Sequence, residues 1–221
     1  MSHSMHQTTQ APVLEAYVLG PFATNCYLVR TPAARGCWIV DPGMNPSPVV
    51  GRVRELSLTP EAILLTHAHM DHIAGVDNVL RAFPGTPVLL HEAEEQWTQD
   101  PSLNLSILSG IGVTCHGPDR VLRHADTLTL EGQEWAVLHT PGHSPGGVTF
   151  YHAPSRTAIV GDTLFAGSIG RTDFPGSDFA TLARSIRERL YTLPDDTTIY
   201  PGHGPESTIG DEKRSNPFVR A

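Results

Sequence analysis

Short apolar runs alternate with turn residues along most of this chain. Such runs occupy 14–19, 26–30 and 37–40, and the third is followed by Asp41-Pro42-Gly43. Short stretches rich in β-branched and other apolar residues, bounded by Gly, Pro and Asn, are typical of strands. The same pattern predicts further strands at 62–65, 87–91, 127–130, 135–138, 148–151, 157–160 and 197–200.

Helical spacing appears between several of these strands. Residues 99–120 are mostly uncharged and fit neither the helical nor the strand period. We therefore expect a loop or short helix there, either at the rim of a substrate site or simply at the surface. Apolar residues three or four positions apart predict helices at 47–56, from an Asp71 cap to about Phe83, through Glu95 and Trp97, and at 180–190.

The strands fall into two sets, and helices follow each set. This order predicts two mixed sheets packed face to face with helices on their outer sides, the four-layer αββα sandwich of the α/β class. A length of 221 residues suits one such domain. We assign 12–221 to this domain and expect residues 1–11, which are polar and patternless, to form a flexible tail.

Composition narrows the range of partners and locations. Lys and Arg total 15 against 23 Asp and Glu, a formal net charge of -8 without a basic stripe, so nucleic acid is not an expected partner. The apolar runs are far too short to span a bilayer, so no membrane partner is expected. Three cysteines without CxxC spacing, and an N-terminus without a signal-peptide pattern, favour the reducing cytoplasm.

The densest group of chemically active side chains follows the strand predicted at 62–65. The sequence Thr66-His67-Ala68-His69-Met70-Asp71-His72 holds three imidazoles and a carboxylate. His67 and His69 stand two apart at a strand end, so both rings point the same way and can bind one ion. Asp71 and His72 enter a helix and diverge toward a second position, so the spacing favours two metal ions over one.

Three more candidate ligands lie far along the chain. His143, Asp162 and His203 each stand where an apolar run meets a Gly-rich turn, as expected of a site assembled from loops at one sheet edge. Imidazole suits zinc, iron, nickel or copper, and a carboxylate can bridge two ions. The remaining histidines of the domain are expected to be structural or exposed, with His139 supporting a neighbour or packing: His91, His116, His124, His139 and His152.

Five motifs in this order resemble the metallo-β-lactamase superfamily over roughly 13–210. They are Asp41-Pro42-Gly43, the HxHxDH sequence from His67 to His72, His143, Asp162 and His203. Within this range, His139-Thr-Pro-Gly-His143 and Gly161-Asp162-Thr-Leu-Phe resemble glyoxalase II, which hydrolyses the thioester of S-lactoylglutathione. The stretches 161–176 and 201–210 are similar to the short bacterial glyoxalase II-like hydrolases, which lack the C-terminal helical domain.

The resemblance implies a centre with two divalent metal ions. It places His67, His69 and His143 on the first ion, Asp71, His72 and His203 on the second, and Asp162 between them. Zinc is the first expectation, with iron and manganese as alternatives. The implied activity is attack on a thioester by a hydroxide held between the ions, and Asp71 would also help to orient that hydroxide.

Substrate contacts are less well defined by the pattern. Arg171 stands where the resemblance implies a basic residue that contacts the glutathione part of a substrate, either as a carboxylate clamp or in a structural ion pair with Asp173. Gly204-Pro205 replaces the aromatic residue that follows the last histidine in glyoxalase II, so glutathione itself is not implied. The expected partner is a small thioester, which a glutathione conjugate would satisfy, and a homodimer is compatible with the sequence.

A second hypothesis for the function concerns a different reaction. The sequence Gly170-Arg171-Thr172-Asp173-Phe174 also resembles the persulfide dioxygenases of this superfamily, whose single iron would be held here by His67, His143 and Asp162. The Gly-Pro after His203 favours the hydrolase. A lactonase is compatible with the same ligands, whereas the contexts of Asp71 and Asp162 disfavour a β-lactamase and no flavin-binding segment supports an accessory redox role.

Overall fold

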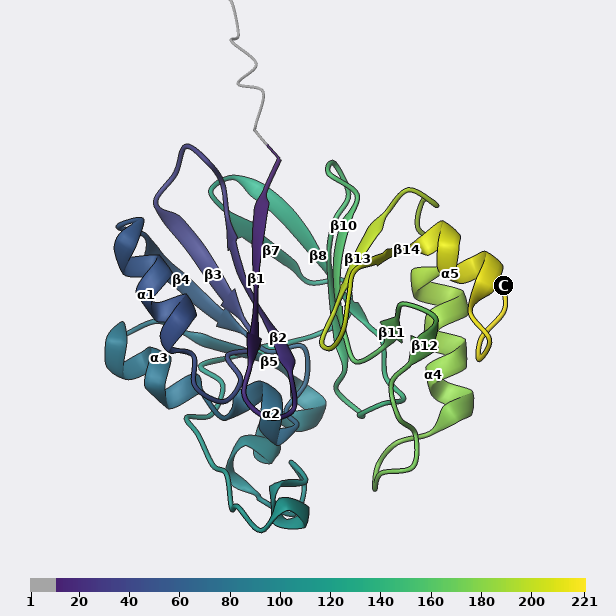
Figure 1. The fold of residues 1–221 in the computed structure, drawn as a ribbon, viewed down its shortest axis with the longest axis horizontal. Coiled ribbons are helices and arrows are strands. Elements are labelled where there is room, and N and C mark those ends of the chain that lie inside the picture. Colours follow the sequence, from purple (N-terminus) through teal and green to yellow (C-terminus); the bar gives the residue numbers. More distant parts are fainter. Residues whose placement is uncertain (1–10) are drawn as a thin grey trace, which may run out of the picture.

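The computed structural model describes residues 11–221 as two six-stranded sheets packed against each other, with helices outside (Figure 1). The αββα sandwich predicted from the sequence is therefore confirmed. The predicted tail lies outside the described residues, apart from its last residue.

The first sheet comes from the N-terminal half of the chain, in the order β1-β2-β3-β4-β5-β6. Strands β1 to β3 pair antiparallel, and β3 to β6 pair parallel. The strands are β1 Val13–Leu19, β2 Thr24–Arg30, β3 Gly36–Val40, β4 Thr59–Leu64, β5 Val88–His91 and β6 Arg120–Leu122.

The second sheet comes from the C-terminal half, in the order β14-β13-β10-β9-β8-β7. Its strands pair antiparallel except for β10 and β13, which are parallel. Its strands are β7 Thr127–Leu130, β8 Gln133–His139, β9 Val148–His152, β10 Thr157–Gly161, β13 Thr198–Pro201 and β14 Ser207–Thr208, and a small hairpin, β11 Leu164–Phe165 and β12 Ser168–Ile169, stands beside it.

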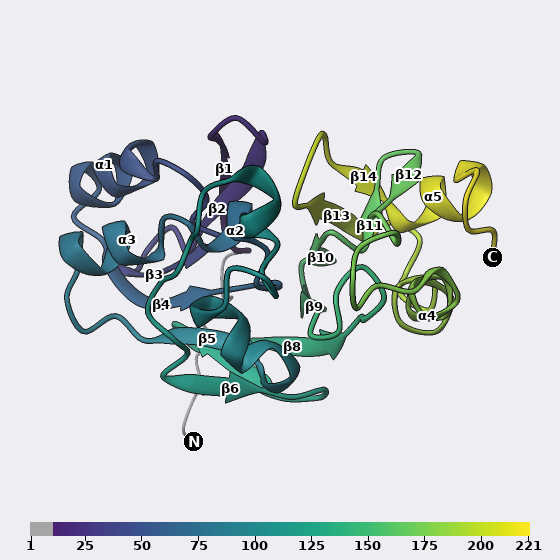
Figure 2. The ribbon, with the colours of Figure 1, turned by 90° about the horizontal axis from the view of Figure 1, so that it is seen from below.

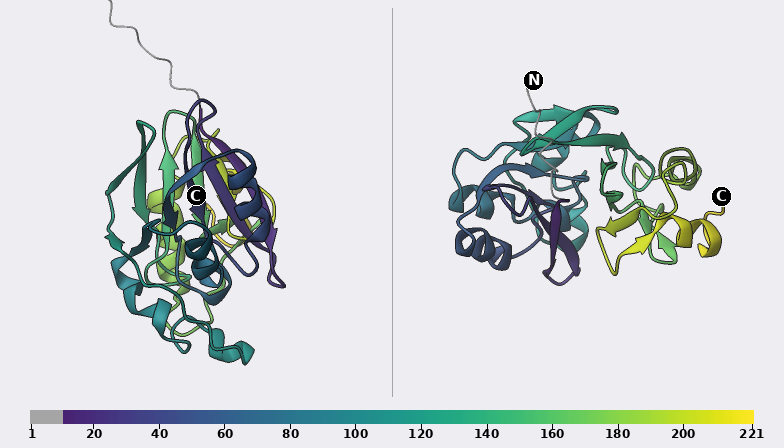
Figure 3. Two further views of the ribbon diagram at one scale, coloured as in Figure 1. Left: turned by 90° about the vertical axis from the view of Figure 1, so that its left-hand side faces the viewer. Right: turned by 90° about the horizontal axis from the view of Figure 1, so that it is seen from above.

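Helices cover the outer face of each sheet. Figure 2 shows α1 and α3 outside the first sheet and α4 and α5 outside the second, and Figure 3 shows the same layers from two other directions. Within residues 11–221, none of the helices has the length and apolarity needed to cross a bilayer. The helices are α1 Ser47–Glu55, α2 Met70–Ile73, α3 Val76–Ala82, α4 Phe179–Ser185 with a π-helical extension Ile186–Leu190, α5 Ile209–Ser215, and the 3₁₀ segments Glu92–Gln99 and Ser106–Ser109.

Strand β2 shows why the layers form. Its side chains alternate between two cores: Cys26 and Leu28 pack toward the helices, whereas Tyr27 and Val29 enter the core between the sheets. This period of two buries both faces of the strand. Between the sheets the indole rings of Trp38 and Trp135 meet edge to face with centroids 5.8 Å apart.

The predicted strands are all present, with ends that differ from the expected ones by up to three residues. The segment after β5 is a 3₁₀ helix, and 99–120 holds the expected short helix together with the first residue of β6. The pattern missed β6, β11, β12, β14 and α5, because two or three extended residues, or two helical turns, leave too few positions to show a period.

The single helix predicted from Asp71 to Phe83 is wrong. The structure divides it into α2 and α3 at Gly75, and the residue that precedes α2 is His69 rather than Asp71. The N–H of Gly75 donates to the carbonyl of Pro42 at 2.7 Å instead of continuing the helix ladder. The break therefore arises from docking against the loop after β3.

That docking leaves no room for a side chain. A Cβ on Gly75 would lie 2.6 Å from the carbonyl oxygen of Pro42 and even closer to that of Gly43, and real Cβ atoms do not approach this closely. A Cβ on Gly43 would in turn lie 2.6 Å from the carbonyl of Asp71. The loop after β3 and the start of α2 are thus held in contact by two glycines.

We predict that Gly75→Ala lowers the free energy of unfolding by about 1–3 kcal/mol, because the backbone must move to admit the methyl group. Urea unfolding of the metal-free protein measures this change. Gly51→Ala is the matched control, since Gly51 lies in α1 and a Cβ added there would have no neighbour within 4 Å, so alanine should leave stability equal or slightly higher. Equal unfolding midpoints for wild type and Gly75→Ala would contradict the account.

Candidate metal centre

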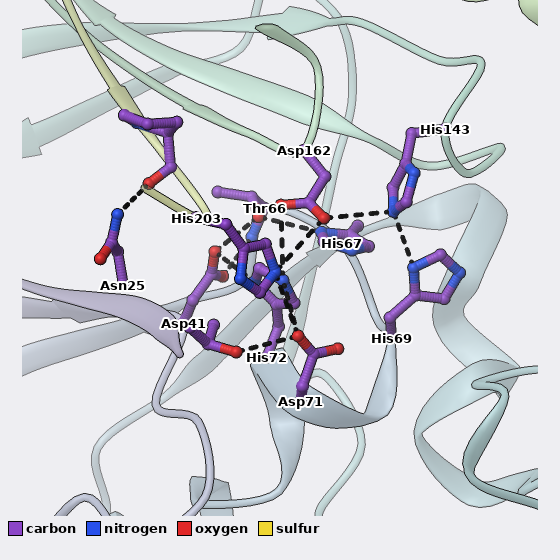
Figure 4. Close-up of polar contacts among 12 residues, drawn as sticks. Asn25, Asp41, Thr66, His67, His69, Asp71, His72, His143, Asp162 and His203 are labelled. Carbon is purple, nitrogen blue, oxygen red and sulfur yellow. Dashed lines mark hydrogen bonds and ion pairs between the residues drawn. The ribbon is translucent and has the colours of Figure 1, made fainter. Parts of the chain in front are cut away.

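The candidate ligands gather where several strands end. His67 and His69 follow β4, Asp162 follows β10 and His203 follows β13, while His143 lies in the loop between β8 and β9 (Figure 4). Backbone contacts join the two sheets beside this point: the N–H of Asn25 donates to the carbonyl of Gly202 at 2.7 Å, and the N–H of Val148 to that of Thr66 at 2.9 Å. All seven residues predicted to be metal ligands are brought together.

Their donor atoms form two main groups linked by a third. One main group contains His67, His69 and His143, the other contains Asp71, His72 and His203, and the linking group contains His67, His72 and Asp162. Within each group the donor atoms lie within 4.8 Å of one another. Asp162 lies between the groups: Oδ2 is 3.5 Å from His143 Nε2 and from His203 Nε2, and Oδ1 is 3.5 Å from His72 Nε2.

These separations fit atoms that share an ion. Two donors on one tetrahedral zinc ion, each at about 2.1 Å, lie about 3.4 Å apart. His203 Nε2 is 3.2 Å and His72 Nε2 3.5 Å from Asp71 Oδ2, and His69 Nδ1 is 2.9 Å from His143 Nε2. The last two nitrogens converge as two ligands of one ion would.

Unsatisfied buried atoms support the same fit. Nε2 of His67 and of His72 and Oδ1 of Asp162 are buried and have no hydrogen-bond partner among the described residues. Such atoms are costly unless something binds them. A cation at the centre would satisfy all three, so the residues present fit divalent metal.

The outer ring nitrogens are held by other groups. His67 Nδ1 lies 3.1 Å from Thr66 Oγ1, and His72 Nδ1 lies 3.0 Å from Asp41 Oδ2. The hydroxyl and N–H of Thr66 both donate to the Asp41 carboxylate, at 2.6 and 2.7 Å. Asp41, which is buried, thereby fixes the orientation of two imidazoles.

Backbone carbonyls hold two further rings. His143 Nδ1 donates to the carbonyl of Arg171 at 2.8 Å, and His203 Nδ1 donates to that of Phe22 at 3.1 Å. A proton on Nδ1 leaves the Nε2 lone pair free, and in both residues Nε2 faces the centre. His69 is reversed, because its Nδ1 faces the centre.

Burial and charge set the protonation of the cluster. Burial, together with neighbouring imidazoles, holds the pKa of His67 and of His69 well below the usual value. Burial also acts to lower the pKa of His72, but the carboxylates of Asp71, Asp162 and Asp41 outweigh it and raise that pKa to about 10. Burial would raise the pKa of Asp71, yet His72 and His203 lower it, so this carboxylate is ionised.

Sequence reasoning missed Glu94. Its carboxylate is fully buried and accepts two backbone hydrogen bonds, from the N–H of Ala68 to Oε2 and from that of Gly146 to Oε1, both at 2.6 Å. Ala68 separates His67 from His69, and Gly146 lies in the loop of His143. Glu94 therefore ties together the segments that carry the first ligand group. The only signal in the sequence was an acidic residue three positions before Trp97, on the same face of the predicted helix.

A cleft of about 620 Å³ opens over the cluster. Five of the seven cluster residues line it, together with Leu105, Leu108 and Ser109 from the uncharged 99–120 segment. The segment therefore lies at the rim of this cleft, and its role as the rim of a substrate site stays a prediction. The remaining lining residues are Arg171 and four apolar residues, namely Phe22, Met70, Phe165 and Phe174.

Arg171 lines the cleft but is already paired. Its guanidinium donates two hydrogen bonds to the carboxylate of Asp173, at 2.9 and 2.7 Å, and lies 4.1 Å from the ring centroid of Phe174. The ion pair with Asp173 considered from the sequence is therefore present, and a role as a carboxylate clamp would require the guanidinium to exchange partners.

The other histidines of the domain lie outside the cluster. His139 stacks on His91 with centroids 4.1 Å apart and donates from Nε2 to the carbonyl of Pro145 at 2.8 Å, so it supports the loop that carries His143. His91 and His152 are buried, and His116 and His124 are exposed. None of these side chains belongs to the metal-ligand groups of the described residues.

Comparisons with known proteins agree with the motifs. Residues 19–203 match the Metallo-beta-lactamase superfamily. The chain is 42% identical to the probable metallo-hydrolase YqgX of Bacillus subtilis, covering 91% of this chain and 94% of the relative. It is 35% identical to the hydroxyacylglutathione hydrolase GloC of Haemophilus influenzae, covering 94% of this chain and 98% of the relative.

Solved structures show the same fold. A B3 metallo-beta-lactamase, BLEG-1, has a TM-score of 0.90 at 41% identity, covering 95% of this chain and all of that one. TTHA1623 in a di-iron-bound form has a TM-score of 0.82 at 38% identity, covering 93% of this chain and 100% of that one. ETHE1 from Myxococcus xanthus has a TM-score of 0.75 at 27% identity, covering 94% of this chain and 84% of that one.

The matched region contains all seven cluster residues, and the relatives cover nearly the whole chain. The chain belongs to the metallo-β-lactamase superfamily.

Proposed function

We propose that this protein is a metal-dependent hydrolase that cleaves thioesters, with S-lactoylglutathione as the reference substrate. The observation that carries the proposal is the pair of ligand groups with Asp162 between them, open on one side to a cleft. His67, His69 and His143 would hold one ion, Asp71, His72 and His203 the other, and Asp162 both. Zinc is the proposed metal, with iron and manganese as alternatives.

Two ions in these positions would activate water at neutral pH and polarise the substrate carbonyl. The chain supplies the arrangement. Asp71 Oδ2 accepts from the hydroxyl of Thr24 at 2.9 Å, which fixes the carboxylate at the floor of the cleft, where it can orient a water molecule. A thiolate leaves without a strong acid, so no further proton donor is needed.

The relatives support hydrolysis. GloC is named a hydroxyacylglutathione hydrolase and YqgX a probable metallo-hydrolase. BLEG-1 is named a β-lactamase, which also attacks a carbonyl, so a β-lactam belongs in the test panel. The di-iron form of TTHA1623 supports iron as an alternative to zinc. Arg171 is the proposed substrate contact, after release from Asp173.

The second candidate is a one-iron persulfide dioxygenase. The structural likeness to ETHE1 favours it, as does the position of Asp162 Oδ2 at 3.5 Å from His143 Nε2, beside His67. In a one-iron enzyme the second ligand group, which contains Asp71, His72 and His203, would not be needed for activity. Cytoplasmic location, a homodimer, and the lack of nucleic-acid or membrane partners stay predictions.

We predict that Asp162→Ala removes both ions, because this carboxylate contacts both ligand groups. Metal analysis of protein purified without oxygen should fall from about two ions per chain to less than one. Asp195→Ala, an exposed partner of Lys213, is the control and should keep its metal. Two ions retained in Asp162→Ala would defeat the bridging assignment.

His72→Ala separates the two candidate reactions. It should lower S-lactoylglutathione hydrolysis at least a hundredfold, since the second ion loses a ligand, while oxygen uptake with glutathione persulfide would survive in a one-iron enzyme. Both assays are run on wild type and variant, and circular dichroism checks folding. Undiminished thioester hydrolysis in the variant would rule out the two-metal mechanism.

Glu94→Gln should weaken metal binding by about 10–100-fold. A glutamine amide can accept only one of the two backbone N–H bonds, and its NH₂ group would face the other donor. Competition with a chelator measures the affinity. Glu95→Gln, at the exposed neighbouring position, is the matched control and should bind as wild type does. Equal affinities in the two variants would refute the positioning role.

A further inference from the structure

The cleft over the metal centre has an apolar side that the proposed hydrolysis does not explain. Six side chains form it, from both halves of the sandwich, and we call them the apolar wall: Phe22, Met70, Leu105, Leu108, Phe165 and Phe174. Met70 and Leu105 are buried near the centre, whereas Leu108 and Phe22 remain 70% and 47% exposed. The wall thus continues from the metal centre to the surface.

The segment that presents Leu105 and Leu108 is held in place. The buried side chain of Asn104 donates to the carbonyls of Trp97 and Val113, both at 2.9 Å, and accepts from the N–H of Ser106 at 3.1 Å. Its own carbonyl accepts from the N–H of Met70 at 3.0 Å. The last of these bonds anchors the segment to Met70, the residue between His69 and Asp71.

Leu105 adopts a backbone conformation that bulky residues rarely take. Its φ is +66°, in the left-handed region, and a leucine there is strained. Strain of this kind persists only where the surroundings fix it, and it concentrates at ligand sites. The bonds of Asn104 on either side supply the fixation, and Leu105 lines the cleft as a result.

Away from the metal centre, the side chains of the cleft offer little positive charge for a polyanionic ligand. Arg171 is the only cationic Lys or Arg side chain among the described lining residues, and both of its hydrogen bonds to Asp173 would have to break before it bound a carboxylate. Glutathione carries two carboxylates. Ser109 is a weak donor to an anionic ligand, because its hydroxyl already donates to the carbonyl of Ser106 at 2.7 Å.

We propose that the apolar wall binds the acyl group of the substrate, so that the preferred substrates are thioesters of unbranched apolar acyl chains. The inference rests on the thioester hydrolysis proposed above and names its acyl part. Burying each methylene along the wall removes apolar surface from water, and a cleft of about 620 Å³ has the size of a small-molecule site.

The test is a series of S-acyl-N-acetylcysteamine thioesters from acetyl to octanoyl, which vary the chain with a constant uncharged thiol. With metal-loaded protein, kcat/KM should rise about two- to fourfold per methylene until the wall is covered. The kcat/KM for the octanoyl thioester should exceed that for S-lactoylglutathione. A flat or falling series, or faster cleavage of S-lactoylglutathione, overturns the inference and leaves thioester hydrolysis standing. Cleavage of none of these thioesters overturns the proposed function itself.

A matched pair of variants locates the effect. Leu108 and Ile107 are adjacent, exposed aliphatic residues of one 3₁₀ turn, but only Leu108 lines the cleft. Leu108→Ser should lower the octanoyl-to-acetyl ratio of kcat/KM at least threefold, mainly through KM, and Ile107→Ser should leave the ratio unchanged. Equal changes in both variants, or none in Leu108→Ser, would show that the wall does not select the acyl group.

Discussion

Five imidazoles and two carboxylates converge on one buried point, and this convergence constrains the rest of the molecule. Polar groups removed from water must find partners, and here several inner atoms have none among the described residues. The outer atoms are therefore held by other groups, as the carboxylate of Asp41 holds Thr66 and His72. The donor atoms of the cluster are thus arranged as ligands of cations.

The sandwich is suited to this arrangement because it joins strand ends from two sheets. Thr24 in β2 forms a β-bridge with His203 beyond β13, so the ligand loops of both halves are connected directly at the centre. Gly43 and Gly75 bring the loop after β3 against the start of α2. Asp41 reaches the imidazoles only from this loop, with a left-handed backbone at φ +49°. Packing and ligand placement are therefore coupled.

The reaction centre and the substrate cleft are separate in origin. The ligands come from loops at strand ends, whereas selectivity is proposed to come from Leu105 and Leu108 in a segment inserted before β6. Similar metal centres can therefore act on different substrates, as the different activities named for BLEG-1 and GloC illustrate. The pairing of Arg171 with Asp173 makes the cleft less suited to anions than the sequence suggested.

The sequence by itself determined the ten longer strands and pointed to the seven side chains of the cluster. A period of two is local, and the HxHxDH spacing keeps His67, His69 and His72 within one short segment between a strand and a helix. Only the tertiary structure decided the break at Gly75, the tie made by Glu94, the nitrogen that each histidine turns inward, and the apolar lining of the cleft. Each of these depends on contacts between segments far apart along the chain, such as Glu94 with Gly146, and no local pattern encodes such contacts.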